Sequence, residues 1–173
     1  MAQFPEALQF TLQWENPRGI YSPLPDNKGF QISGINSAEQ PLYYSAILAT
    51  PIGQRAAAVA EAYQNAFWTP MRLGGIADQD VANRVFDEGV NAGAETATRM
   101  LQEAVNALTG VPGTPLAIDG DLGPESLSAV NSAPPESLLA SFRTLRCQRY
   151  RDIAAANPSD TVDLAGWLTR AMA

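Results

Sequence analysis

The chain has 173 residues, of which 46% are hydrophobic and 17% are charged, and its formal net charge is −7. This length and composition predict one ordered domain with a core of its own. Histidine is absent and Cys147 is the only cysteine. Ser-His-Asp and Cys-His catalysis, His-ligated zinc or haem, and an internal disulfide are therefore excluded. We expect no metal and no cofactor.

Charge and hydropathy also limit the partners of the chain. Positive charge is not concentrated in any stretch, which argues against binding to nucleic acid. The opening MAQFPE has neither a basic region nor an apolar run, so we expect no Sec signal peptide. No stretch approaches 18 consecutive apolar residues, which argues against membrane insertion. These features favour a soluble domain, which we expect to be a monomer.

The first predicted helix is followed by a long irregular segment. Phe4, Leu8 and Leu12 give the helix one apolar face, and the pattern ends near Glu15. From residue 16 to 51, proline, glycine and asparagine interrupt any period of 3.6 residues. We expect loops there, with a short hairpin around residues 30–35.

Helical patterns return after Gly53 and continue to the end of the chain. Asp78 is a good N-cap for one of these helices, and a turn is expected at 118–120, where Gly120 supplies a positive φ. The helix that follows Asp78 carries apolar residues from Val81 to Val90. The other predicted helices cover roughly 54–67, 94–108, 124–130, 135–156 and a last segment after 160. The sequence therefore predicts a mainly α fold.

Carboxylates are the main candidates for proton transfer, because histidine is absent. Glu15 stands at the end of the first helix beside Trp14, where the helix dipole and the aromatic side chain disfavour the ionised carboxylate. A carboxyl group that stays protonated near neutral pH is the general acid that glycoside hydrolysis requires. The alternative is a solvated glutamate at a helix end.

Other candidate residues each allow two interpretations. Asp26 is either a site residue or part of a turn, and Trp68 is either a sugar-stacking platform or a core aromatic residue. Asp87 and Asn91 are four residues apart on one helix and so face the same side. Either Asn91 binds substrate, or Asp87 merely holds the loop that follows Glu15. Glu88 is expected to be solvated.

Cationic side chains recur every three residues on the long helix expected at 135–156. They are Arg143, Arg146 and Arg149, and such a row usually pairs with nearby carboxylates. Cys147, between them in sequence, has the character of an inert small apolar group.

Several segments carry recognisable motifs in order along the chain. Trp14-Glu15 leads to Tyr21, the segment VFDEGVNAG lies at 85–93, and IDGDLGPES lies at 118–126. Together they resemble the glycoside hydrolase family 108 lysozymes, which are N-acetylmuramidases with a peptidoglycan-binding-type C-terminal half. In that family the first helix ends in Glu-Gly-Gly-Tyr. Here Tyr21 follows Glu15 by six residues instead of three.

The resemblance implies a lysozyme-like helical domain with a loop or short hairpin after the first helix. Residues 1–109 would be the catalytic part, and residues 110–173 a peptidoglycan-binding-type helical part packed into the same globule. The implied activity is hydrolysis of the β-1,4 bond between N-acetylmuramic acid and N-acetylglucosamine. Glu15 would be the general acid, and the substrate-binding residues would be Tyr21, Asp26, Gln31, Trp68, Asp87 and Asn91.

Peptidoglycan glycan strands are the partner that the resemblance implies. An endolysin-like enzyme without a Sec signal would be made in the cytoplasm and would reach the wall by a holin-type or dedicated export route. An inverting mechanism through a positioned water is the expected route if no second carboxylate acts as nucleophile.

Two alternatives remain open. The first is a catalytically silent peptidoglycan-binding or structural module, which is favoured by the altered loop. There, Lys28 replaces a glycine and Gln31 a threonine of the family pattern. The second is a transglycosylase that uses one glutamate and forms anhydro-muramic acid, which differs only in its product.

Overall fold

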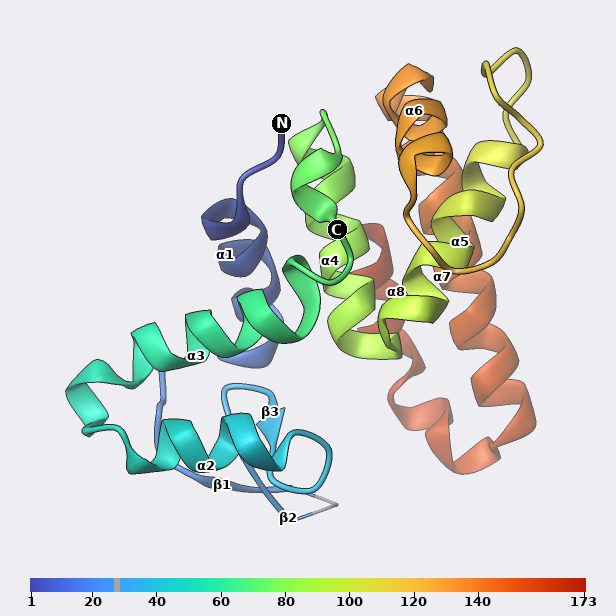
Figure 1. Cartoon of the computed structure of the whole chain (residues 1–173). Coiled ribbons are helices and arrows are strands. Elements are labelled where there is room, and N and C mark those ends of the chain that lie inside the picture. The colour runs from blue at the N-terminus through green and yellow to red at the C-terminus, as the bar shows by residue number, and fades with distance from the viewer. Residues whose placement is uncertain (27–28) are drawn as a thin grey trace.

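The computed structural model describes residues 1–26 and 29–173, with their side chains except those of Asp26, Pro158 and Asp160. The fold is mainly α, as predicted, and a short hairpin follows the first helix (Figure 1). The α-helices of the described residues are α1 (Phe4–Glu15), α2 (Pro41–Ala49), α3 (Arg55–Tyr63), α4 (Gln79–Ala92), α5 (Ala94–Asn106), α6 (Pro124–Ser132), α7 (Pro135–Ala156) and α8 (Leu164–Met172).

A small antiparallel sheet contains β1 (Leu24–Asp26), β2 (Gly29–Ile32) and β3 (Ile35–Asn36), in that order. Ile32 pairs with Ile35, so Ser33 and Gly34 form a two-residue turn. Their φ angles are +50° and +81°, and positive φ at both central positions matches the right-handed twist of the strands. The predicted hairpin is confirmed.

The helix α2 corrects our expectation that residues 16–51 are loop and hairpin only. It packs against β2 and β3, with Tyr44 and Ile47 buried. Apolar side chains occupy nearly every side of this helix, and Leu42 remains exposed. The sequence PLYYSAILA therefore contains no apolar stripe of period 3.6 from which a helix could be recognised.

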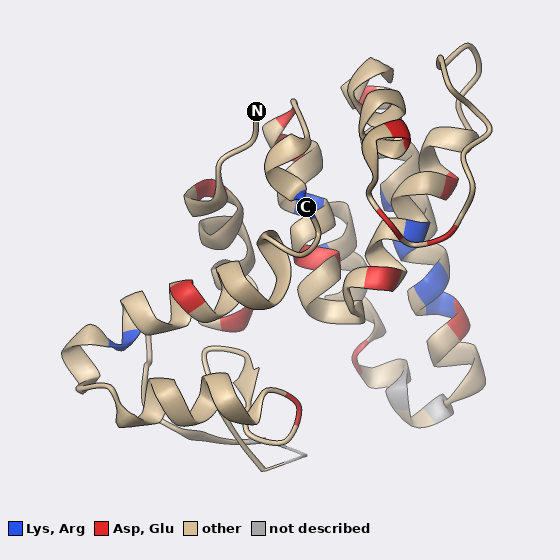
Figure 2. Cartoon of the chain, viewed as in Figure 1, with Lys and Arg blue, Asp and Glu red and all other residues tan. Residues whose placement is uncertain are grey.

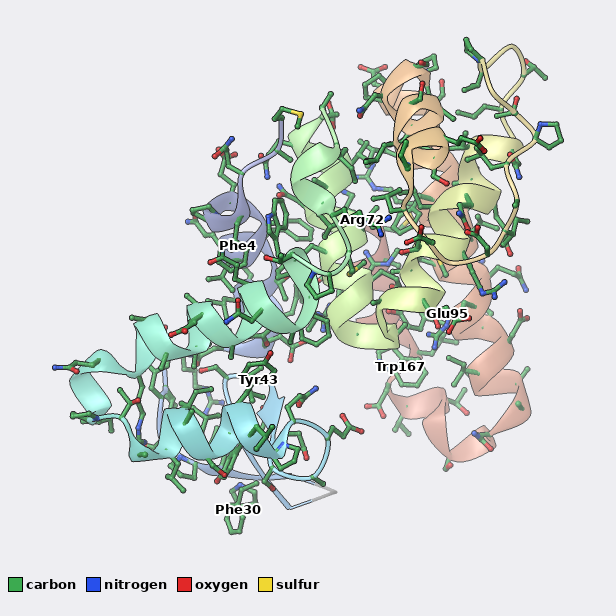
Figure 3. The ribbon with its side chains drawn as sticks, viewed as in Figure 1. Phe4, Phe30, Tyr43, Arg72, Glu95 and Trp167 are labelled. Atoms are coloured by element: carbon green, nitrogen blue, oxygen red, sulfur yellow. The ribbon has the colours of Figure 1, made fainter. Side chains whose placement is uncertain are left out.

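An aromatic cluster lies where α1, α4 and the segment at residues 63–68 meet. The helix α4 packs against α1 and α5, and α7 packs against α5 and α8. The Phe86 ring lies 5.8–6.1 Å from the rings of Phe4, Tyr63 and Trp68. Figure 3 shows Phe4 on the side of α1 that faces this cluster. The main core includes residues from Ala2 to Phe142, so it spans both parts that the sequence suggested.

The expected turn at 118–120 is fixed by a buried glutamine. The Gln102 amide nitrogen donates to the Asp119 carboxylate (2.8 Å), and its oxygen accepts from the Gly120 N–H (3.0 Å). The φ angle of Gly120 is +81°, as expected for this turn. The hydrogen bond from Gln102 is the main reason why the pKa of Asp119 is lowered. The glycine-rich segment is thus anchored to α5.

Charged side chains are unevenly distributed. Figure 2 shows them mainly on the helices α4 to α8, whereas α2 carries none. Within the described residues, no helix has both the length and the apolar character needed to cross a bilayer.

Candidate active site

Glu15 lies at the end of α1, against the tip of the β2–β3 hairpin. A Cβ atom added to Gly34 would lie 2.8 Å from Glu15 Oε2 and 2.5 Å from the Tyr63 hydroxyl. Only glycine fits there, since its φ of +81° also disfavours other residues. The Tyr63 hydroxyl donates a hydrogen bond to the Ser33 carbonyl at 2.9 Å. The Glu15 side chain is 20% exposed, so it is accessible to solvent.

Asn16 determines how the chain leaves α1. Its backbone N–H donates to Leu12 O at 2.9 Å, which completes the last turn of the helix. Its side chain accepts from the Ile20 N–H (2.7 Å) and donates to Ser33 Oγ (2.9 Å). One asparagine therefore links the helix end, the following loop and the hairpin that packs on Glu15.

Arg170, on α8, is the direct charged partner of Glu15. Its Nη2 lies 2.7 Å from Glu15 Oε1 and 2.8 Å from Asp87 Oδ1, and its side chain is 12% exposed. Burial on its own lowers the pKa of Arg170. The hydrogen bonds and negative charges of Asp87 and Glu15 outweigh that effect and raise the pKa above the ordinary arginine value. Arg170 was not singled out in the sequence analysis, which missed this role.

The ion pairs continue from Asp87 into the interior. Arg146 Nη2 lies 2.8 Å from Asp87 Oδ2, and Arg146 Nε lies 2.6 Å from Glu88 Oε2. All three of these side chains are fully buried. The expectation that Glu88 is solvated was wrong, because Arg146 on α7 neutralises it inside the protein. The expected pairing of the arginine row is confirmed for Arg146 and for Arg149, whose Nη1 lies 4.0 Å from Glu88 Oε1.

The Tyr150 hydroxyl extends this network to the surface. It lies 2.9 Å from Asn91 Oδ1 and 3.3 Å from Glu88 Oε2. Burial and the nearby Glu88 charge raise the pKa of Tyr150, which keeps its hydroxyl protonated. Asn91 itself is exposed. It lies at the opposite end of the network from Glu15.

The structure corrects two of the expected substrate contacts. Asp87 is fully buried between Arg146 and Arg170, so its carboxylate oxygens are already occupied by guanidinium groups. Asp87 holds Arg170, which contacts Glu15. This differs from the alternative in the sequence analysis, in which Asp87 holds the loop that follows Glu15. Trp68 is buried against Phe4 and Phe86, which supports a core role and not a sugar-stacking platform.

The other predicted site residues are Tyr21, Asp26 and Gln31. Gln31 and Asp26 lie in strands of the small sheet, and Tyr21 lies in the segment that leads to it. The Gln31 side chain accepts a hydrogen bond from the Gly34 N–H at 2.9 Å, so it holds the turn that faces Glu15. Tyr21 is partly buried against the core, and its carbonyl accepts from Arg55 at 2.9 Å. The side chain of Asp26, and Lys28 with it, lie outside the described residues.

Part of this chain is similar to a known protein family. Residues 96–172 match a protein family described as a predicted peptidoglycan domain. The match begins inside α5 and ends with α8, so it contains both Arg146 and Arg170. The C-terminal part of the chain is similar to that family. A search of curated proteins returns no match.

A solved structure supports the fold along nearly the whole chain. The structure of SagA from Brucella abortus superimposes with a TM-score of 0.65, covering 98% of this chain and 93% of that chain. The two sequences are 18% identical, so the likeness shows a shared fold.

Proposed function

We propose that the chain is a peptidoglycan hydrolase of the family 108 lysozyme type. It cleaves the β-1,4 bond between N-acetylmuramic acid and N-acetylglucosamine, with Glu15 as general acid. The observation that carries the proposal is the placement of Glu15. A partly exposed carboxyl group at the end of α1 is fixed between the hairpin tip and Arg170. The peptidoglycan-domain match at residues 96–172 supports the wall as the place of action.

In this proposal, protonated Glu15 donates its proton to the glycosidic oxygen as the bond to the anomeric carbon breaks. Positive charge develops on the sugar ring, and a water attacks the anomeric carbon and releases its proton to solvent. Asp87 and Glu88 are fully buried and ion-paired, so neither is placed to activate that water. The resemblance to the family suggests Asp26 or Gln31 for positioning the water or binding sugar hydroxyls. Tyr21 and Asn91 are the proposed sugar contacts.

A silent binding module is the second candidate, and a cavity on the C-terminal part favours it. The cavity has a volume of about 630 Å³ and lies between α5 and α7, within the peptidoglycan-domain match. Met100, Leu145 and Ile153 supply apolar lining, and Arg149 and Asp152 supply charge. A wall ligand bound there would need no catalytic glutamate.

The Glu15→Gln variant separates the two candidates. The amide keeps the shape of the side chain but has no proton to donate to the leaving oxygen. We expect loss of lysis in a turbidity assay on purified peptidoglycan, with the melting temperature largely kept. Glu6→Gln, an exposed site on the same helix, is the control with the same change of charge and should lyse like wild type.

Two results would contradict the hydrolase proposal. One is a Glu15→Gln variant that keeps most of the wild-type rate. The other is a wild-type protein that sediments with peptidoglycan but releases no reducing ends, which is the behaviour of a binding module. Mass spectrometry of the released sugars adds the product type, since hydrolysis leaves a reducing end and transglycosylation leaves an anhydro sugar.

A further inference from the structure

Arg170 reaches Glu15 from a helix that is firmly attached to the rest of the protein. Trp167, Leu164 and Leu168 of α8 pack around Tyr150 and Cys147 of α7, and Figure 3 shows Trp167 at this contact. The Ala173 carbonyl accepts hydrogen bonds from Arg84 and from Arg143, the latter at 2.9 Å. The position of Arg170 is therefore set by α4 and α7, independently of Glu15.

The charge of Arg170 opposes the role proposed for Glu15. A guanidinium group 2.7 Å from a carboxyl group favours its ionised form, whereas a general acid must carry a proton. No other described cation is recorded in an ion pair with Glu15. Asp87, on α4, binds the same guanidinium group. Arg170 therefore shares its positive charge between two carboxylates, those of Glu15 and Asp87.

Tyr63 is the other titratable group that faces Glu15, and it comes from α3. Burial, and then the charge of Glu15, raise the pKa of Tyr63 well above its ordinary value. Its hydroxyl is already used as a donor to the Ser33 carbonyl. The hairpin tip at Ser33 and Gly34 adds no titratable side chain. Among the described residues, Arg170 is thus the cation that contacts Glu15 directly.

We propose that Arg170 is a positioning residue that controls the proton on Glu15 and so sets the pH range in which the site acts. The ion pair with Arg170 favours the carboxylate form of Glu15. Protonation of Glu15 removes the ion pair and leaves a carboxyl group that is able to protonate the glycosidic oxygen. This inference rests on the proposed function, and it makes the C-terminal helix a regulator of the catalytic glutamate.

The decisive measurement is the rate of peptidoglycan lysis against pH for wild type and for Arg170→Gln. Without the cation, Glu15 keeps its proton to higher pH, so we expect the alkaline limb to move upward by about one pH unit or more. Arg170→Lys retains the charge and should keep the limb near that of wild type. Arg143→Gln is the matched control, because it loosens the same helix without touching Glu15.

A purely structural role would give a different pattern. In that case Arg170→Gln would lower the rate at every pH and leave the limb in place, which would overturn the proposal. Arg170→Gln leaves Asp87 buried with one cation fewer. If that variant does not fold, the double variant with Asp87→Asn removes both charges and serves instead.

A second readout does not depend on lysis. The Glu15 carboxyl carbon can be followed by ¹³C NMR during a pH titration, with its signal assigned by its loss in Glu15→Gln. We expect it to titrate at higher pH in Arg170→Gln than in wild type, and coincident curves would refute the role of Arg170. If wild type releases no sugar at any pH, the proposed function fails, while this titration still decides the inference.

Discussion

Replacing Asp87 by asparagine tests whether the buried ion pairs stabilise the fold. The carboxylate has no exposure and accepts hydrogen bonds from Arg146 at 2.8 Å and from Arg170 at 2.8–3.2 Å. The variant turns one oxygen into an amide group that faces two guanidinium groups. Removing one partner of a buried pair costs about 3–5 kcal/mol. Glu88 still compensates Arg146, so we expect a loss near 3 kcal/mol, at the low end of that range.

Urea unfolding and thermal melting followed by circular dichroism measure this loss. For a chain of this length, about 3 kcal/mol corresponds to a melting temperature lowered by roughly 6–12 °C. Asp80→Asn on the same helix is the control. Asp80 pairs with Arg84 but is 69% exposed, so its loss should stay within about 0.5 kcal/mol. An Asp87→Asn variant within about 1 kcal/mol of wild type would refute the assigned role of the network.

Two further substitutions test the surroundings of Glu15 and the far end of the network. Gly34→Ala places a methyl group 2.5 Å from the Tyr63 hydroxyl at a positive φ, so we expect a loss of about 2–4 kcal/mol and slower lysis. Thermal melting checks it, and an unchanged melting temperature would contradict it. Asn91→Ala, at an exposed position, should weaken sedimentation with peptidoglycan at a nearly unchanged melting temperature. A stability loss of about 1–3 kcal/mol would instead make Asn91 a structural partner of Tyr150.

Local patterns were sufficient for most of the helical fold. Asp78 does cap α4, since its carboxylate accepts from the Val81 N–H at 2.9 Å. Turn chemistry predicted a hairpin around residues 30–35, and the structure has it at residues 29–36. The helix α2 was missed for a physical reason. A helix that is apolar on almost every side has no stripe to reveal it, and its packing against β2 and β3 depends on tertiary contacts.

The candidate site was predictable only in part. Glu15 could be selected because a helix end and a neighbouring aromatic side chain are local features. Its partner Arg170 lies 155 residues away in the sequence, and no local pattern predicts an ion pair between residues so far apart. Glu88 was placed in solvent because it lies outside the apolar stripe of α4. Its burial depends on Arg146, which arrives from another helix.

The charges of the site explain why the two parts of the chain form one body. Glu15, Asp87 and Glu88 belong to the part that we assign to catalysis, and each has its cation in the peptidoglycan-type part, from Arg146 or Arg170. Without those arginines, the carboxylates of Asp87 and Glu88 would lie buried and uncompensated, which is strongly unfavourable. Residues 1–109 and 110–173 are therefore not separate folding units, since they share one core and these ion pairs. The C-terminal part neutralises buried carboxylates of the N-terminal part and also contacts Glu15.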